Sequence, residues 1–147
     1  MYTITDTCMV RTAAAKIRAI MATRAGGRLP RTERGWERLL ASFGVDIWEC
    51  RRHTRHFRAR LRIDPRGAAV YLSPRLTPYQ KMRVLCHELA EYIAVTLYPS
   101  PADDLCADYH YDGGAQPQDY RHLVAREVER LAFPRLPLFW AVRPTPR

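Results

Sequence analysis

Residues 77–97 read TPYQKMRVLCHELAEYIAVTL and carry the pattern that decides the fold. Thr77 is a good N-cap, Pro78 suits the first helical position, and Gln80 can complete a capping box. A helix is therefore predicted to begin here and to run to about Leu97, where a proline follows within two residues. Apolar side chains lie all around this helix, which predicts that it is buried on most of its sides.

Three ionisable residues, His87, Glu88 and Glu91, interrupt the apolar surface of this helix. Side chains at positions i and i+4 stack on one face of a helix, so His87 and Glu91 can reach the same metal ion. Glu88 lies about 100° further round the axis, where it could take a proton from water at such an ion. Because ionisable groups on a buried helix need a metal, a counter-charge or hydrogen bonds, the sequence predicts a divalent metal site here.

The stretch His87-Glu88-Leu89-Ala90-Glu91 is similar to the His-Glu-x-x-His helix of zinc peptidases, with glutamate in place of the second histidine. Carboxylate oxygen is an accepted zinc ligand, so the replacement preserves a candidate site. It also adds a negative charge, which should lower the Lewis acidity of the ion and make the site more tolerant of manganese. Zinc is therefore the first expectation for the metal, and manganese is the second.

A catalytic zinc site normally has three protein ligands and one open position. Large apolar side chains define one face of the last predicted helix, residues 117–133: Tyr120, Leu123, Val124, Val128 and Leu131. Glu127 falls within this face, and a carboxylate that faces the core needs a cation, so Glu127 is the predicted third ligand. An ion pair with one of the many arginines is the alternative. His122 and Glu129 fall on the opposite side, which predicts a solvated face.

A further candidate lies in residues 98–116, which are predicted to form a long loop. His110 in this loop could bind the metal or donate a hydrogen bond to developing negative charge, and an ordinary loop histidine is the competing interpretation. Cys106 and His110 could also form a metal pair. We therefore keep His110, His122 and Glu129 as secondary site candidates.

The N-terminal part of the chain, residues 1–44, is predicted to be helical. Residues 9–23 are rich in alanine, which favours a helix, and a Gly-Gly pair follows them. Residues 32–43 place their apolar side chains at helical spacing, which predicts a second, amphipathic helix. At the other end of the chain, residues 134–147 contain four prolines and are expected to form an extended tail.

Three strands are predicted between the helical segments, at residues 45–50, 57–63 and 68–73, because apolar residues alternate with polar residues or a short apolar run is bounded by turn signals. The last two are expected to form a hairpin around the turn at residues 64–67, within a small antiparallel sheet. The second strand should have a basic outer face, because its apolar residues alternate with Arg58, Arg60 and Arg62.

The composition bounds the remaining possibilities. A chain of 147 residues with 47% hydrophobic residues predicts one globular domain, residues 1–147. No run of eighteen apolar residues exists and residues 1–16 lack a secretory-signal pattern, so no membrane association is expected. Four widely spaced cysteines indicate reduced thiols and a cytoplasmic location. The net charge of +9 is carried almost wholly by arginine, spread along the chain.

The order of these elements resembles the ImmA/IrrE family of metallopeptidases. The likeness is carried by residues 45–92, in which a hairpin strand leads through residues 70–78 into the helix segment RVLCHELAEY at residues 83–92. The family's later Glu-Ala-Asn-x-Phe-Ala segment is similar to residues 127–132, EVERLA, and this likeness also makes the first glutamate a metal ligand. The resemblance covers roughly residues 36–138. The chain departs from the family pattern at Glu91, where the family has histidine, and at Leu131, where it has phenylalanine.

This resemblance implies a zincin-like α+β fold, in which a small antiparallel sheet packs with a buried motif helix and further helices. It implies a metal-dependent endopeptidase in which His87, Glu91 and Glu127 hold the ion and Glu88 is the general base. Known members cut helix-turn-helix repressors and so release stress-response or mobile-element genes. The expected partner is therefore a protein substrate such as a transcriptional repressor.

Two other classes of function stay open from the sequence. A protein of the same fold could bind a metal or a regulator without hydrolysing it. A basic module could instead contact nucleic-acid phosphates through residues 51–62, RRHTRHFRARLR. That segment offers no element that could read bases, so contact with nucleic acid is expected to be non-specific at most.

Overall fold

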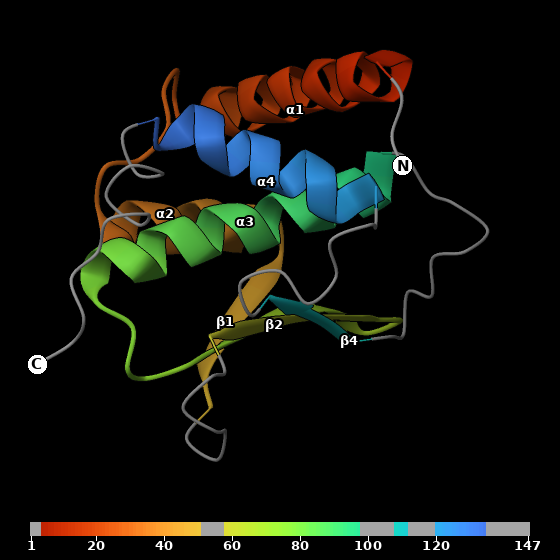
Figure 1. Cartoon of the computed structure of the whole chain (residues 1–147). Helices are drawn as coiled ribbons and strands as arrows, with labels where there is room; N and C mark the ends of the chain where they lie inside the picture. The colour runs from red at the N-terminus through yellow and green to blue at the C-terminus, as the bar shows by residue number, and fades with distance from the viewer. Residues whose placement is uncertain (1–3, 51–57, 98–107, 112–119, 135–147) are drawn as a thin grey trace, which may run out of the picture.

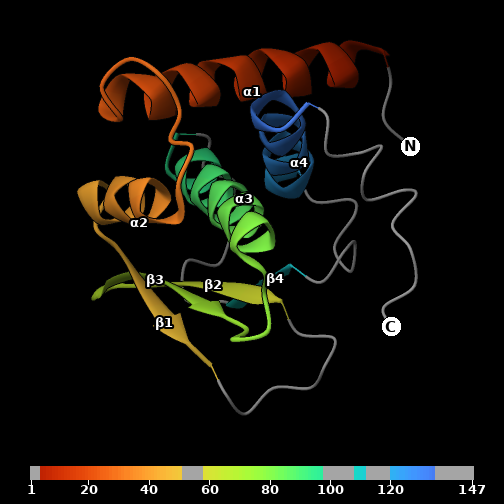
Figure 2. The same ribbon diagram turned by 90° about the vertical axis from the view of Figure 1, so that its left-hand side faces the viewer.

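The computed structural model describes residues 4–50, 58–97, 108–111 and 120–134. Its elements follow the order α-α-β-β-β-α-β-α, and the predicted α+β class is confirmed. All four helices lie on one face of the sheet, as Figures 1 and 2 show from two sides. No helix within these described ranges combines the length and apolar character that a membrane span requires.

The sheet has four strands in the order β1-β3-β2-β4. Their bounds are β1 Val45–Glu49, β2 Ala59–Asp64, β3 Gly67–Leu72 and β4 Asp108–Tyr111. Strands β2 and β3 form the predicted antiparallel hairpin. Its turn is held by Asp64 Oδ1, which accepts hydrogen bonds from the backbone N–H groups of Arg66 at 2.8 Å and Gly67 at 3.2 Å.

The sheet departs from the sequence prediction in two ways. It is mixed rather than antiparallel throughout, because β3 lies between β1 and β2 and pairs parallel with β1 but antiparallel with β2. The expected loop at residues 98–116 also contains β4, which pairs antiparallel with β2. The alternating aromatic residues of the DYHY segment, residues 108–111, suit a strand. The remainder of that predicted loop, like the tail at residues 135–147, lies outside the described residues.

The outer face of the sheet confirms the alternation predicted for the arginine strand. Ala59, Leu61 and Ile63 are buried under the helices, whereas Arg60 is half-buried and Arg62 is exposed on the opposite face. The two guanidinium groups lie 5.6 Å and 5.5 Å from the centre of the Tyr71 ring on the neighbouring strand. Stacking of arginine on an aromatic ring thus accounts for part of this basic surface.

The helices pack in two layers above the sheet. Helix α3 (Pro78–Leu97) lies next to the sheet beside α2 (Glu33–Ser42), and α4 (Tyr120–Ala132) lies on α3 beneath α1 (Ile4–Arg24). The buried apolar side chains of these layers form one continuous cluster, whose largest members include Trp36, Ile17, Met21, Leu40, Leu61, Leu72, Leu85 and Leu89.

The central position of α3 confirms that the motif helix is buried on most sides. Eleven of its residues are buried, because it contacts α4, α2, α1 and the sheet. The helix begins with the predicted capping box: the Gln80 N–H donates to Thr77 Oγ1 at 3.2 Å, and the Thr77 N–H donates to Gln80 Oε1 at 3.0 Å. Local chemistry thus fixes where α3 starts, and packing in the middle of the molecule buries its ionisable residues.

Candidate metal centre

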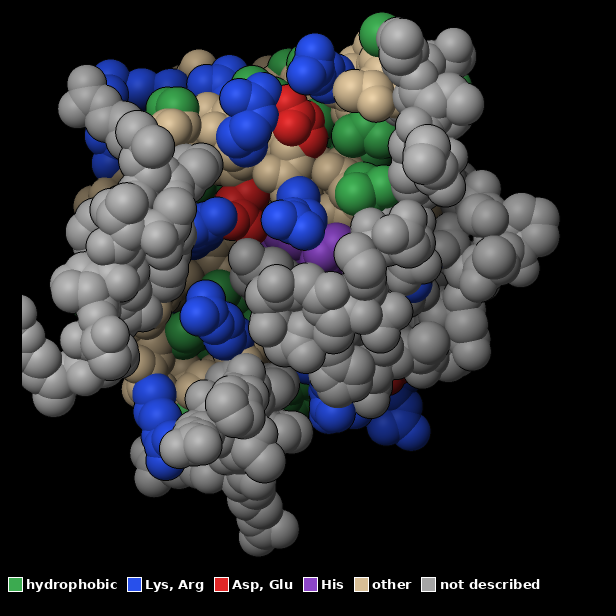
Figure 3. Space-filling view, viewed as in Figure 1, with side chains coloured by type: hydrophobic (Ala, Val, Ile, Leu, Met, Phe, Trp, Pro, Cys, Tyr) green, Lys and Arg blue, Asp and Glu red, His purple; other side chains and the backbone are tan. Residues whose placement is uncertain are grey.

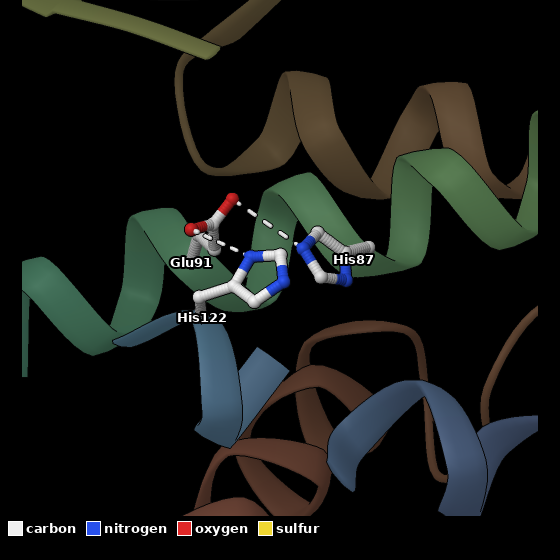
Figure 4. A group of neighbouring side chains, drawn as sticks. All are labelled: His87, Glu91 and His122. Atoms are coloured by element: carbon white, nitrogen blue, oxygen red, sulfur yellow. Dashed lines mark ion pairs between the residues drawn. The ribbon is translucent and has the colours of Figure 1, made fainter. Parts of the chain in front are cut away.

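Three side chains that can bind a metal meet where α3 packs against α4. His87 and Glu91 project from α3, and His122 projects from α4 towards them (Figure 4). One ligand atom from each lies within 4.8 Å of the others. His87 Nε2 is 3.5 Å from Glu91 Oε2, and His122 Nδ1 is 3.8 Å from Glu91 Oε1. The two imidazole rings meet edge to face, with their centres 4.9 Å apart.

These separations suit a single divalent ion. Zinc binds imidazole nitrogen and carboxylate oxygen at about 2.0–2.2 Å, so two tetrahedral ligands lie about 3.4 Å apart and no pair exceeds about 4.2 Å. The His87–Glu91 distance of 3.5 Å is close to the tetrahedral value and the Glu91–His122 distance of 3.8 Å is within the limit, although they end on different oxygens of Glu91. The three ligand atoms as a set lie within 4.8 Å, so the side chains would move closer together around an ion. Two imidazoles and one carboxylate also form an accepted donor set for a catalytic zinc. The residues therefore fit the ion.

All three candidate ligands are buried. His87 is 0% exposed, His122 is 1% exposed and Glu91 is 3% exposed. In the space-filling view, histidine appears only as a small area between basic and acidic side chains (Figure 3). Polar groups so far from solvent must satisfy one another or hold a ligand.

Glu88 is a further buried group of the cluster that needs a proton or a positive neighbour. It is 0% exposed, and neither of its carboxylate oxygens has a hydrogen-bond partner among the described residues. Burial, followed by the nearby Glu91 carboxylate, raises the pKa of Glu88 well above its usual value. A charged, unpartnered carboxylate at this depth would be costly, so this group needs a positive neighbour to ionise.

The pKa values of His87 and Glu91 depend on each other's charge when no ion is bound. Burial alone lowers the pKa of His87, but hydrogen bonds with Glu129 and Glu91 outweigh it and raise that pKa to about 10. Burial alone raises the pKa of Glu91, yet contacts with His122 and His87 lower it to about 2. In the absence of an ion, a proton on His87 therefore supplies positive charge between the carboxylates.

A fifth residue, Glu129 of α4, contacts the other side of the His87 ring. Its Oε1 lies 3.1 Å from His87 Nδ1, and its Oε2 accepts a hydrogen bond from Arg83 Nε. Glu129 is 3% exposed, and these two partners hold its pKa below the usual value although burial acts in the opposite direction. The site thus has three candidate ligands, one adjacent carboxyl group and one supporting carboxylate.

The prediction for the face of α4 is wrong. Glu127 was expected to face the core, but it pairs with Arg130, whose Nε lies 3.0 Å and 3.1 Å from its two carboxylate oxygens. This ion pair is the alternative that the sequence left open, and it lowers the pKa of Glu127. His122 and Glu129, expected on a solvated face, are both buried. The structure thus brings His122, and not Glu127, to His87 and Glu91.

The reason for this error lies in the small residues of α4. Helix α4 contacts α1 as well as α3, and Ala125 is one of its fully buried side chains, at 0% exposed. A face centred on Ala125 includes His122 and Glu129, whereas a face drawn through the large apolar residues points about one residue's rotation away. Inclusion of Ala125 in the buried face would have located His122.

His110 remains a secondary candidate from the sequence. Its backbone is part of β4, where it pairs with Arg60 of β2, and the structure gives no description of its side chain. Cys106, its suggested partner in a metal pair, lies outside the described residues.

Comparison of the chain with models of known protein families, with curated proteins and with solved structures finds no match. The resemblance to ImmA/IrrE metallopeptidases therefore stays a prediction carried by the motif at residues 83–92 and by the order of the elements around it. The chemistry of the site depends on the five buried polar groups of α3 and α4.

Proposed function

We propose that this protein is a metal-dependent hydrolase whose divalent ion is held by His87, Glu91 and His122. The observation that carries the proposal is the convergence of these three buried side chains beside a fourth buried group, Glu88, that has no described hydrogen-bond partner. Two imidazoles, one carboxylate and an adjacent glutamate are the groups that metal-assisted hydrolysis needs. Zinc is the first choice for the ion, and manganese is the second.

Each residue has a defined part in this chemistry. A bound divalent ion supplies Lewis acidity, which makes water acidic near neutral pH and polarises a carbonyl oxygen. The neutral imidazoles and the Glu91 carboxylate hold that charge in place. Positive charge at the cluster would favour ionisation of Glu88, which could then accept a proton from the attacking water and return it to a leaving amine. The buried setting of Glu88 serves this role, since it raises the pKa of the carboxyl group and so makes its carboxylate a stronger base.

Peptide bonds are the proposed substrate class. Support comes from the likeness of His87–Glu91 to the helix motif of zinc peptidases and from the order of elements at residues 45–92. A zincin-like fold and a regulatory protein substrate, such as a helix-turn-helix repressor, belong to the same proposal. So does a cytoplasmic location, with which the free thiols of Cys8, Cys50 and Cys86 agree.

A second candidate function is a metal-binding protein that does not hydrolyse its partner. The observation in its favour is the nearly complete burial of His87, Glu91 and His122, because closed metal sites are usually structural, whereas catalytic sites keep a position open. In such a protein the ion would join α3 to α4 and stabilise the fold. Metal removal would then change stability without any associated activity.

The Glu88→Gln variant separates the two candidates. Zinc-loaded wild type and variant would be incubated with candidate repressors, and cleavage would be followed by mass spectrometry. Glu127→Gln, which changes a half-buried carboxylate of α4 that pairs with Arg130, is the matched control. We expect Glu88→Gln to retain zinc and lose about a hundredfold or more of the cleavage rate, because general-base assistance is worth that much. Equal cleavage by wild type and Glu88→Gln would contradict the assigned base, and zinc binding without cleavage of any candidate would favour the second function.

A further inference from the structure

A hydrogen-bonded chain leads from Arg83 through Glu129 to His87. Arg83 and His87 are separated by one helical turn on α3, so both face the Glu129 carboxylate of α4. Arg83 Nε donates to one oxygen of Glu129, and the other oxygen lies 3.1 Å from His87 Nδ1. The Glu129 side chain is 3% exposed and that of Arg83 is 20% exposed, so the chain begins at the edge of the core and ends at the candidate ion site.

The geometry constrains which nitrogen of His87 can bind an ion. A carboxylate oxygen only accepts hydrogen bonds, so Nδ1 must carry a proton to satisfy Glu129. Nε2 of a neutral imidazole then keeps its lone pair, and this is the nitrogen that lies 3.5 Å from Glu91. The opposite tautomer would place the Nδ1 lone pair against the Glu129 oxygen, with two acceptors in contact.

Charge explains why the carboxylate is itself paired with arginine. Glu91 and Glu88 already bring two carboxyl groups to a buried site. A third, uncompensated negative charge there would be costly, but the guanidinium of Arg83 cancels that of Glu129. Glu129 can therefore orient His87 without changing the net charge of the site, and a divalent ion with ionised Glu88 and Glu91 would make the whole group neutral.

We propose that Arg83 and Glu129 are positioning residues that hold His87 with Nδ1 protonated and Nε2 aimed at the ion. The inference rests on the proposed metal site, and it assigns a specific role to two residues that touch neither the ion nor a substrate. Hydrogen bonds of this kind to a ligand histidine fix its tautomer and orientation, and their loss weakens metal binding about 10–100-fold.

The test combines zinc affinity with the state of the His87 ring. Zinc affinity would be measured by competition with a chelator for wild type, Arg83→Met, Arg83→Lys and Glu129→Gln, after circular dichroism has shown that each is folded. Glu127→Gln is the matched control, since Glu127 forms an ion pair on the same helix. Arg83→Met and Glu129→Gln should bind zinc about 10–100-fold more weakly. Arg83→Lys, which keeps the positive charge, should recover most of the loss, and Glu127→Gln should match wild type.

The ring itself can be examined without any variant. Nitrogen-15 spectra of the histidine side chains in zinc-loaded wild type should show His87 with a proton on Nδ1 and zinc on Nε2. Zinc on Nδ1, or wild-type affinity in both Arg83→Met and Glu129→Gln, would overturn the positioning role. Failure of the wild-type chain to bind zinc would instead remove the metal site itself, and zinc binding without hydrolysis would leave the positioning role intact.

Discussion

Zinc binding should become roughly a hundredfold tighter for each proton displaced when the pH rises from about 6 to about 8. The perturbation is proton competition at His87, whose pKa in the ion-free protein is raised to about 10 by Glu129 and Glu91. A ligand histidine must be neutral, so every pH unit below that value weakens apparent affinity about tenfold, or about 1.4 kcal/mol. The sign is fixed: higher pH favours the ion.

The number of protons that zinc displaces depends on which of the buried groups around His87 carry a proton before the ion binds. His87 accounts for one proton. Glu88, whose pKa is raised by burial and by Glu91, accounts for up to one more if the ion allows it to ionise. The structure therefore predicts the release of between one and two protons per zinc near neutral pH, since one divalent ion replaces the protons that balance the carboxylates.

Titration calorimetry in buffers of different ionisation enthalpy measures these protons directly. Wild type should release more protons per zinc than Glu88→Gln, and the difference gives the share of Glu88. The control variant Glu127→Gln should behave as wild type, because Glu127 pairs with Arg130 away from the cluster. An affinity that does not change with pH, with no proton released, would refute the view that His87 is a protonated residue that becomes a ligand.

Three further predictions concern the fold around the site. The ion-free protein should lose stability as the pH rises from about 6.5 towards 10, because the raised pKa of His87 stabilises only its protonated form. It should also lose stability as the pH falls from about 4.5 towards 2, because the lowered pKa of Glu91 stabilises only its ionised form. Thermal denaturation midpoints that do not change with pH would contradict both expectations. Glu127→Ala should change the unfolding free energy measured in urea by less than about 1 kcal/mol, because the partner Arg130 is 54% exposed and solvent weakens such ion pairs. Ala125→Leu should cost about 1–3 kcal/mol and weaken zinc binding, because the added atoms would force α4 away from its neighbours; unchanged stability would show that this contact is loose.

The parts of the fold that the sequence predicts well are those set by local chemistry. The capping box at Thr77 and Gln80 fixes the start of α3, and the Asp64–Gly67 turn fixes the hairpin. Sheet order depends on contacts between distant segments, so the parallel pairing of β1 with β3 and the addition of β4 do not follow from local patterns.

Only the part of the site on α3 could be predicted from the sequence, because the part on α4 depends on contacts between distant segments. His87, Glu88 and Glu91 belong to one helix, and their spacing alone places them together. The third candidate ligand depends on which face α4 turns towards α3, and the buried face of α4 includes Ala125, His122 and Glu129 as well as large apolar side chains. The sequence therefore predicts His122 on a solvated face and Glu127 in the core, whereas His122 is buried and Glu127 is half-buried in an ion pair with Arg130.

Metal content of the purified chain and two variants tests the central claim most directly. Wild type, His122→Ala and Glu127→Ala would be loaded with zinc, dialysed and analysed for the element, with circular dichroism as the check on folding. A site formed by His87, Glu91 and His122 predicts one ion per chain in wild type and in Glu127→Ala, and loss of the ion from folded His122→Ala. Retention of zinc by His122→Ala together with its loss from Glu127→Ala would contradict the site, as would a wild-type chain that holds no ion.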